Sequence, residues 1–383
     1  MWGNAMSKPV NALQIADLLQ TRGGGAAPFK ALVGLDGFVD EIMCVVDKRK
    51  SAESFTRIGT LDSLGERISR AAGLSTNIEL VGVTQKLGGN GPIFANAMSA
   101  LGVAVSYIGA LGTPSIHPVF SEMGGKCELI SIAEPGLSFN LEFEDGKLIM
   151  SKLDSLKKIT WSGLKEEFGL ERLADMISGA DLFGLENWTM IPYMSDIFRG
   201  IIDEVFPLIR SNSALAFFDL ADPEKRLKED LSEALELIKR FSGRFRTVLG
   251  VNKKEAVRVA AALGVSGFSA PEIPVEDIDL AELTVKIGEA LDIFCFVVHT
   301  VHEAGAYSCG EYHDAPGYYT PHPRLTTGAG DNFNAGLCLG LLLGLPVSES
   351  LLLGTASSGF YVRETRSACL TELIDFIKNV EVK

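Results

Sequence analysis

The chain has 383 residues, of which 46% are hydrophobic and 22% charged, and its formal net charge at pH 7 is −14. This composition is typical of a globular protein with a large core, and the length suits one large α/β domain or two smaller ones. The negative charge argues against nucleic acid or an anionic membrane surface as a partner, because both require a basic protein surface. The six cysteines lack metal-ligand spacing, and no apolar stretch has membrane-spanning length, so we expect a reduced, cytoplasmic protein.

The first strand of the predicted fold ends in acidic residues. We expect a short helix over residues 11–21 and a buried strand over 29–35, followed by Asp36 and Asp40. Acids at the carboxyl end of a buried strand are well placed to bind a ligand in an α/β sheet. A turn at Asp36 and a helix cap at Asp40 explain the same residues on local grounds, so both interpretations stay open at this stage.

A glycine-rich segment precedes the next long helix. After a helix over 61–73 and a strand over 78–83, Gly88, Gly89 and Asn90 lead into an apolar stretch that ends near residue 102. Glycines at such a point let a ligand approach the backbone, and the free N–H groups of the first helical turn can bind hydroxyl groups. A plain turn is the simpler explanation of an isolated glycine pair.

The rest of the chain alternates between strands and helices. Residues 127–153 predict two or three strands, with a hairpin turn at 144–146. From residue 162 onward, alternating helices and buried strands indicate a mainly parallel sheet. The expected helices are 162–179, 194–210, 347–361 and 371–379, and the expected strands are 181–185, 215–220, 247–250 and 293–298.

The most informative stretch is residues 326–333, TTGAGDNF, which enters an apolar helix. Three small residues, Gly328, Ala329 and Gly330, allow close approach to the backbone, and the unpaired N–H groups and dipole of the helix favour an anion. Asp331 fits two interpretations equally well. It is a helix cap, or it is a base held beside a phosphate that is being transferred.

The longer stretch TTGAGDNFNAG closely resembles the signature of the PfkB-type carbohydrate kinases, the ribokinase-like family of sugar and nucleoside kinases. Further landmarks follow in family order from about residue 30: the pair Gly88-Gly89, the segment 222–226, Asn252 with Glu255, and Thr300 with Gly305. The resemblance implies a ribokinase-like three-layer α/β/α sandwich with a mostly parallel central sheet. It also implies a single domain over 1–383, with a small β-lid built from about 41–60 and 126–153.

The same resemblance implies ATP-dependent phosphorylation of a hydroxyl group on a sugar or related small polyol. Asp331 would accept the hydroxyl proton, and the turn 328–330 would be the anion hole for the transferred phosphoryl group. Mg²⁺ would bridge the phosphates, with Glu255 acting on it indirectly, through water. The implied substrate-binding residues are Asp36, Asp40, Gly88, Gly89 and Asn90, and the implied nucleotide-binding residues are Asn252, Glu255, Thr300, Gly305 and Thr327.

Two departures from the family pattern keep alternatives open. Ile93 stands where the family usually has Asn, and His302 replaces a glycine. A nucleoside kinase of the same fold would need an apolar slot for its base, and a catalytically weakened sugar-binding regulatory protein would tolerate both changes. We further expect a homodimer through the lid and an unphosphorylated acceptor, with Lys147 pointing to solvent.

Overall fold

The computed structural model describes residues 15–17, 19–20, 29–209, 214–268 and 274–381. Within them, the largest feature is a nine-stranded sheet in the order β14-β13-β12-β11-β10-β9-β1-β5-β6. The strands from β12 to β6 run parallel, and β13 and β14 add an antiparallel hairpin at one edge. The strands are β1 (Lys30–Leu35), β5 (Ala104–Gly109), β6 (Cys127–Ser131), β9 (Leu182–Leu185), β10 (Leu215–Asp219), β11 (Arg246–Asn252), β12 (Cys295–His299), β13 (Glu303–Ser308) and β14 (Glu311–Pro316).

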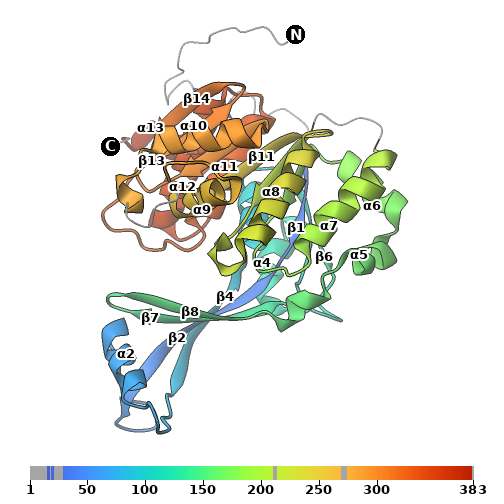
Figure 1. Cartoon of the computed structure of the whole chain (residues 1–383). Helices are drawn as coiled ribbons and strands as arrows, with labels where there is room; N and C mark the ends of the chain where they lie inside the picture. Colours follow the sequence, from blue (N-terminus) through green and yellow to red (C-terminus); the bar gives the residue numbers. More distant parts are fainter. Residues whose placement is uncertain (1–14, 18, 21–28, 210–213, 269–273, 382–383) are drawn as a thin grey trace.

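Helices cover both faces of this sheet (Figure 1). One layer consists of α5 (Trp161–Phe168), α6 (Leu170–Ser178), α7 (Met194–Gly200), α8 (Lys228–Phe241), α9 (Lys253–Leu263) and α10 (Leu280–Leu291). The other consists of α3 (Asn90–Ala100), α4 (Ser121–Gly124), α11 (Ala329–Leu342), α12 (Val347–Glu364) and α13 (Leu370–Asn379).

Alternation along the strands builds the two cores. In β10, Phe218 packs with the first layer, while its neighbour Phe217 packs with the second and stacks on Phe94 of α3 at 5.3 Å between ring centroids. Strands buried on both faces read as continuous apolar runs, which is why they stood out in the sequence. The three-layer α/β/α sandwich is therefore confirmed.

Two predicted helices are not continuous α-helices. The helix expected over 162–179 is two helices, because Gly169 ends α5 with a φ of +73°. The helix expected over 194–210 is regular only to Gly200 and continues as a π turn and a short 3₁₀ turn to Leu208. The helix expected over 11–21 lies largely outside the described residues, of which 15–17 and 19–20 are helical.

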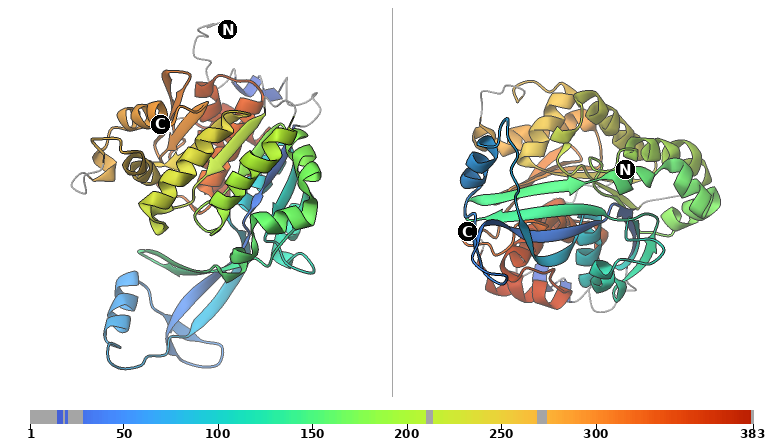
Figure 2. Two further views of the ribbon diagram at one scale, coloured as in Figure 1. Left: turned by 45° about the vertical axis from the view of Figure 1, so that its right-hand side comes forward. Right: turned by 90° about the horizontal axis from the view of Figure 1, so that it is seen from below.

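A second, five-stranded sheet projects from the body of the molecule (Figure 2). The helix α2 (Leu61–Ser69) packs on it, burying Leu64 against Val45, Ile58 and Leu141. The strands of this sheet are β2 (Phe38–Arg49), β3 (Phe55–Arg57), β4 (Leu80–Gly88), β7 (Gly136–Phe143) and β8 (Gly146–Lys152). The chain passes directly from β1 into this sheet, so β2 begins beside the carboxyl edge of the large sheet. β4 ends there as well, since Gly88 pairs with Phe38.

The bounds expected for this small sheet need one correction. Residues 127–131 were expected in the lid segment 126–153, but they form β6 of the large sheet. The reason is that Val105 pairs with Cys127 in parallel register and both side chains are buried in the second core. The strand β4, which the sequence did not assign to the lid, pairs with β2 along most of its length.

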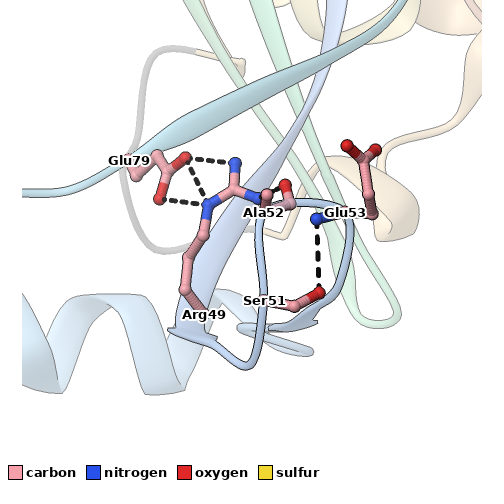
Figure 3. A network of polar contacts seen from close by, with 5 residues as sticks. All are labelled: Arg49, Ser51, Ala52, Glu53 and Glu79. Carbon is pink, nitrogen blue, oxygen red and sulfur yellow. Dashed lines mark hydrogen bonds and ion pairs between the residues drawn. The ribbon is translucent and has the colours of Figure 1, made fainter.

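The basic run 48–50 lies at the far end of the small sheet. There the guanidinium of Arg49 donates to the carboxylate of Glu79, with 3.0 Å from Nε to Oε1, and to the carbonyl of Ala52 at 2.7 Å (Figure 3). In the same loop the N–H of Glu53 donates to Oγ of Ser51. Arg49 is thus held at the tip by local partners.

No helix in the described parts of the chain combines the length and the apolar character that a membrane crossing needs.

Candidate functional site

Polar side chains gather at the carboxyl edge of the large sheet. Asp36 follows β1, Glu186 follows β9, Asp219 ends β10, Asn252 ends β11, and His299 ends β12. Because these strands are parallel neighbours, their ends lie side by side. In open α/β sheets this edge is where ligands bind.

The predicted signature forms the entry to α11 at this edge. Gly328 precedes the helix with a φ of +90°, and the N–H of Ala329 donates to the carbonyl of Thr326 at 3.1 Å. Gly330 lies against His299, whose Cε1 would be 3.3 Å from an added Cβ. The amide of Ala329 is therefore engaged within the turn, while the rest of the first helical turn keeps the orientation that favours an anion.

Asp331 lies in the first turn of α11, with only 5% of its surface exposed. Its Oδ1 accepts a hydrogen bond of 2.9 Å from Nδ2 of Asn90, at the start of α3. Burial raises the pKa of Asp331 to about 8, and the hydrogen bond from Asn90 acts in the opposite direction. The structure thus brings together two predicted residues that are 241 positions apart in the chain.

Asp36 is completely buried and anchors the start of α3. Its carboxylate accepts from the N–H groups of Asn90 at 3.1 Å and Gly91 at 3.0 Å, and from Nδ2 of Asn187 at 2.7 Å. The hydroxyl of Tyr107 is a further donor at 3.2 Å. Burial raises the pKa of Asp36 to about 6, against the lowering effect of these donors. The role of Asn187 could not be predicted, because nothing in its local sequence indicates that it contacts Asp36, which follows a different strand.

Asp40 lines a cavity of about 380 Å³ between the small sheet and the signature turn. Other lining residues include Asn140, Lys147, Thr327 and Tyr361. Burial raises the pKa of Asp40 to about 6. Both Asp36 and Asp40 were implied as substrate-binding residues; of the two, Asp40 lines this cavity and Asp36 does not.

The carboxylates of Asp36 and Asp40 explain why glycine occupies positions 88 and 89. An added Cβ at Gly88 would collide with the carboxylate of Asp40. At Gly89, which has a φ of +98°, it would lie 2.7 Å from Oδ2 of Asp36. Both positions therefore exclude a side chain.

Lys147 was expected to point to solvent; it is exposed, and its ammonium group also donates to Oγ1 of Thr327. This contact arises because β8 places Lys147 opposite Glu142, on a residue pair that borders the cavity. The alternation of side chains along the hairpin could have revealed this. Lys147 and Ile149 lie on the same face of β8, and Ile149 pairs with Asn140, which also lines the cavity.

A second cavity, of about 490 Å³, lies on the other side of the signature turn. Its lining includes Ala329, Gly330, Asn252, Thr300 and Tyr319. Gly305 and Thr327, both predicted to contact nucleotide, are not among its lining residues. Gly305 lies inside β13, opposite Val298, because β13 begins at Glu303, directly after the turn.

More carboxylates are buried near Asp331. The pKa values of Glu186 and Asp219 are raised well above their usual range, chiefly by burial and then by neighbouring acids. Neither carboxylate oxygen of Glu186 has a hydrogen-bond partner within the described residues. Glu255 accepts from the N–H groups of Asn252 at 2.9 Å and Asp222 at 2.8 Å, so it completes the capping box of α9.

In the described parts of the chain, no group of three or more His, Cys, Asp or Glu side chains is arranged to hold a metal ion. The acids at this edge therefore do not form a metal site made of protein ligands alone.

The family can now be identified. A sequence model of the prokaryotic ketohexokinase family matches residues 24–380. The chain belongs to this family. It is also 30% identical over 349 residues to a ketohexokinase from Haloferax volcanii, an alignment that covers 91% of this chain and 90% of the relative.

Solved structures agree with the fold. A ribokinase from Thermotoga maritima has a TM-score of 0.62 at 16% identity, covering 92% of this chain and 100% of its own. Arabidopsis thaliana ribokinase, solved with ribose and ATP, has a TM-score of 0.63 at 14% identity, covering 92% and 99%. At these identities the likeness shows the fold alone. Together with the family match, it identifies a sugar kinase, a phosphotransferase with an alcohol acceptor, and the kinase family implies ATP as co-substrate.

The hydrogen bond between Asn90 and Asp331 yields a first prediction. Asp331 should titrate near pH 8, and Asn90→Ala should raise its pKa further, because the ionised carboxylate loses a donor. Carbon-13 NMR of labelled aspartate carboxyl groups, assigned with Asp331→Asn, measures both values. A midpoint below pH 5 in the wild type would contradict the buried environment described above.

Proposed function

We propose that this protein transfers the γ-phosphoryl group of ATP to a hydroxyl group of a ketohexose. The family match and the name of the Haloferax relative support this substrate class. The observation that carries the mechanism is the position of Asp331. It is buried at the entry of α11 and hydrogen-bonded to Asn90, one residue after Gly330, which lines the larger cavity. Thr326, at the start of the same segment, lines both cavities.

In this proposal the sugar occupies the cavity beside the small sheet. Asp40 accepts hydrogen bonds from the hydroxyl groups of the sugar, and Asn140 both donates to them and accepts from them. Asp331 takes the proton from the attacking hydroxyl, and the amides of Gly328, Gly330 and Asp331 stabilise charge on the transferred phosphoryl group. A general base with a pKa near the working pH is effective, because it is both available and strong enough to accept a proton.

ATP occupies the cavity of about 490 Å³, with its phosphates toward Ala329 and Gly330. Mg²⁺ would enter this site as a complex with the nucleotide, because Mg²⁺ is usually bound through substrate phosphates together with one or two carboxylates. When bound, the ion neutralises charge on the phosphates. Glu255 and Asp219 lie near the phosphate end of the bound nucleotide and would bind water molecules that are coordinated to the ion.

We further propose that the small sheet is a lid and that Lys147 acts from it. The ammonium group contacts Thr327, one residue before Gly328, so it lies beside the predicted phosphoryl position. This positive charge faces the buried carboxylate of Asp40 and favours the entry of a phosphate group. Closure of the sheet would also exclude water from the reaction.

Removing the charge of Lys147 tests its role. Lys147→Met should lower kcat by about tenfold while the chain stays folded, because one charge-assisted contact to the phosphoryl group is lost. Lys152→Met, an exposed position on the same strand, is the matched control and should keep the wild-type rate. Equal kinetics for the two variants would remove Lys147 from the mechanism.

Asp331→Asn tests the proposed base. This variant keeps the size and the capping ability of the side chain, so ATP and sugar should still bind while turnover falls by roughly 10²–10⁴. ADP release, measured with ketohexoses, aldohexoses, nucleosides and sugar monophosphates, tests the acceptor at the same time. Unphosphorylated ketohexoses should give the highest kcat/KM. A higher kcat/KM for a nucleoside would contradict the proposed ketohexose substrate. An unchanged turnover rate for Asp331→Asn would contradict its role as the base.

A homodimer through the small sheet remains a proposal. Its support is β4, which pairs on one side with β2 and exposes Leu80 and Val83, at 37% and 59% of their surfaces. Open strand edges with apolar side chains favour association with a second chain. Light scattering after size exclusion should give twice the chain mass, and Val83→Lys should reduce it to the monomer. A monomeric wild type would refute the dimer.

A further inference from the structure

One tyrosine outside the signature contacts its turn directly. The hydroxyl of Tyr361, on the last part of α12, donates to the carbonyl of Thr327 at 2.9 Å. The Tyr361 side chain is 8% exposed and borders the cavity that contains Asp40. This contact lies immediately before Gly328, where the predicted anion hole begins.

The contacted carbonyl belongs to the central peptide of a tight turn. Residues 326–329 form this turn, closed by the hydrogen bond from the N–H of Ala329 to the carbonyl of Thr326. Gly328, the third residue, has φ and ψ of 90° and 0°, the values of that position in a type II turn. Type I and type II turns differ by a flip of the central peptide, here the one joining Thr327 to Gly328.

We propose that Tyr361 is a positioning residue that holds this peptide in the type II orientation. The C=O and N–H groups of a trans peptide point in opposite directions. By fixing the carbonyl of Thr327, the tyrosine hydroxyl therefore aims the N–H of Gly328 away from itself. This inference rests on the proposed function, in which amides of the turn bind the transferred phosphoryl group.

The space around Gly328 is too small for a side chain. An added Cβ would lie 2.7 Å from the hydroxyl of Tyr361 and 3.1 Å from its Cζ. The tyrosine ring therefore packs directly against the glycine whose peptide it orients. A side chain at this position would displace the hydroxyl from the carbonyl of Thr327.

The same turn of α12 holds the loop that leads to the signature. Arg363 donates to the carbonyls of Tyr318 at 2.9 Å and Tyr319 at 2.8 Å, and the N–H of Arg324 donates to the carbonyl of Val362 at 2.8 Å. The loop is thus attached at its start, its middle and, through Tyr361, at its end. A donor mounted on a well-attached helix can fix a peptide more closely than a donor on a loose segment.

The hydroxyl remains a donor over the working pH range. Burial raises the pKa of Tyr361, and the negative charges of Asp331 and Asp40 raise it further. The proton that binds the carbonyl of Thr327 is therefore retained when the neighbouring carboxylates ionise.

Tyr361→Phe removes this single hydrogen bond and keeps the ring. We expect kcat to fall about tenfold, the scale of one hydrogen bond, with both KM values and the melting temperature unchanged. Tyr193→Phe, at an exposed residue away from both cavities, is the control and should behave as the wild type. A kcat within twofold of the wild type would overturn the proposal. A loss of kcat accompanied by an equal change in both KM values and a lower melting temperature would also overturn it, since that pattern indicates a general packing role.

An NMR measurement tests the role of Tyr361 independently of the proposed substrate. In protein labelled with ¹⁵N-glycine, the amide of Gly328, assigned with Gly328→Ala, should give one sharp resonance in the wild type. In Tyr361→Phe it should broaden or split, because the peptide samples both orientations. This measurement needs no sugar, so it holds even if the acceptor is not a ketohexose. Identical Gly328 resonances in the two proteins would show that the hydroxyl does not hold the peptide.

Discussion

The buried negative charge around Asp331 is the constraint on which the site depends. Asp36, Glu186 and Asp219 come from neighbouring strand ends, and Asp331 faces them from α11. Removing an ionised carboxylate from water is costly, and like charges at short range add to that cost. The protein responds by retaining protons, as the raised pKa values show, and by saturating Asp36 with donors. The resulting site favours cations and the phosphates that accompany them.

The two cavities approach each other at one short segment, and separate elements hold that segment. Asn90, fixed through Asp36, contacts Asp331 from α3. Tyr361 contacts the carbonyl of Thr327 from α12. Lys147 reaches the Thr327 side chain from the small sheet, which belongs to no layer of the sandwich. The segment can therefore respond to both substrates, because each cavity is lined by an element that contacts it.

The sequence predicted the fold and the signature well, for physical reasons. Strands buried on both faces are continuous apolar runs, and the parallel order follows from their alternation with helices. The entry to α11 was recognisable because its small residues and its aspartate are adjacent in the chain. In contrast, β6 could not be separated from the lid, since a short strand does not show which sheet it joins.

Residues whose roles depend on distant partners were harder to predict. The different roles of Asp36 and Asp40 could not be predicted, because they depend on the donors Asn187, in the loop after β9, and Tyr107 of β5. Gly305 fitted a family spacing, but β13 begins early and places it inside a strand. Tyr361 has no local feature that marks it, because its importance comes from the carbonyl that it meets 34 positions away.

Counting bound protons tests the central claim, that the buried acids around Asp331 hold protons at neutral pH. Potentiometric titration of the folded wild-type protein and of Asp331→Asn, at equal concentration, measures the protons released between about pH 6.5 and about pH 9.5. The account predicts that the wild type releases most of one proton more than Asp331→Asn over this range, because burial raises the pKa of Asp331 to about 8. Equal proton release by the two proteins would contradict it.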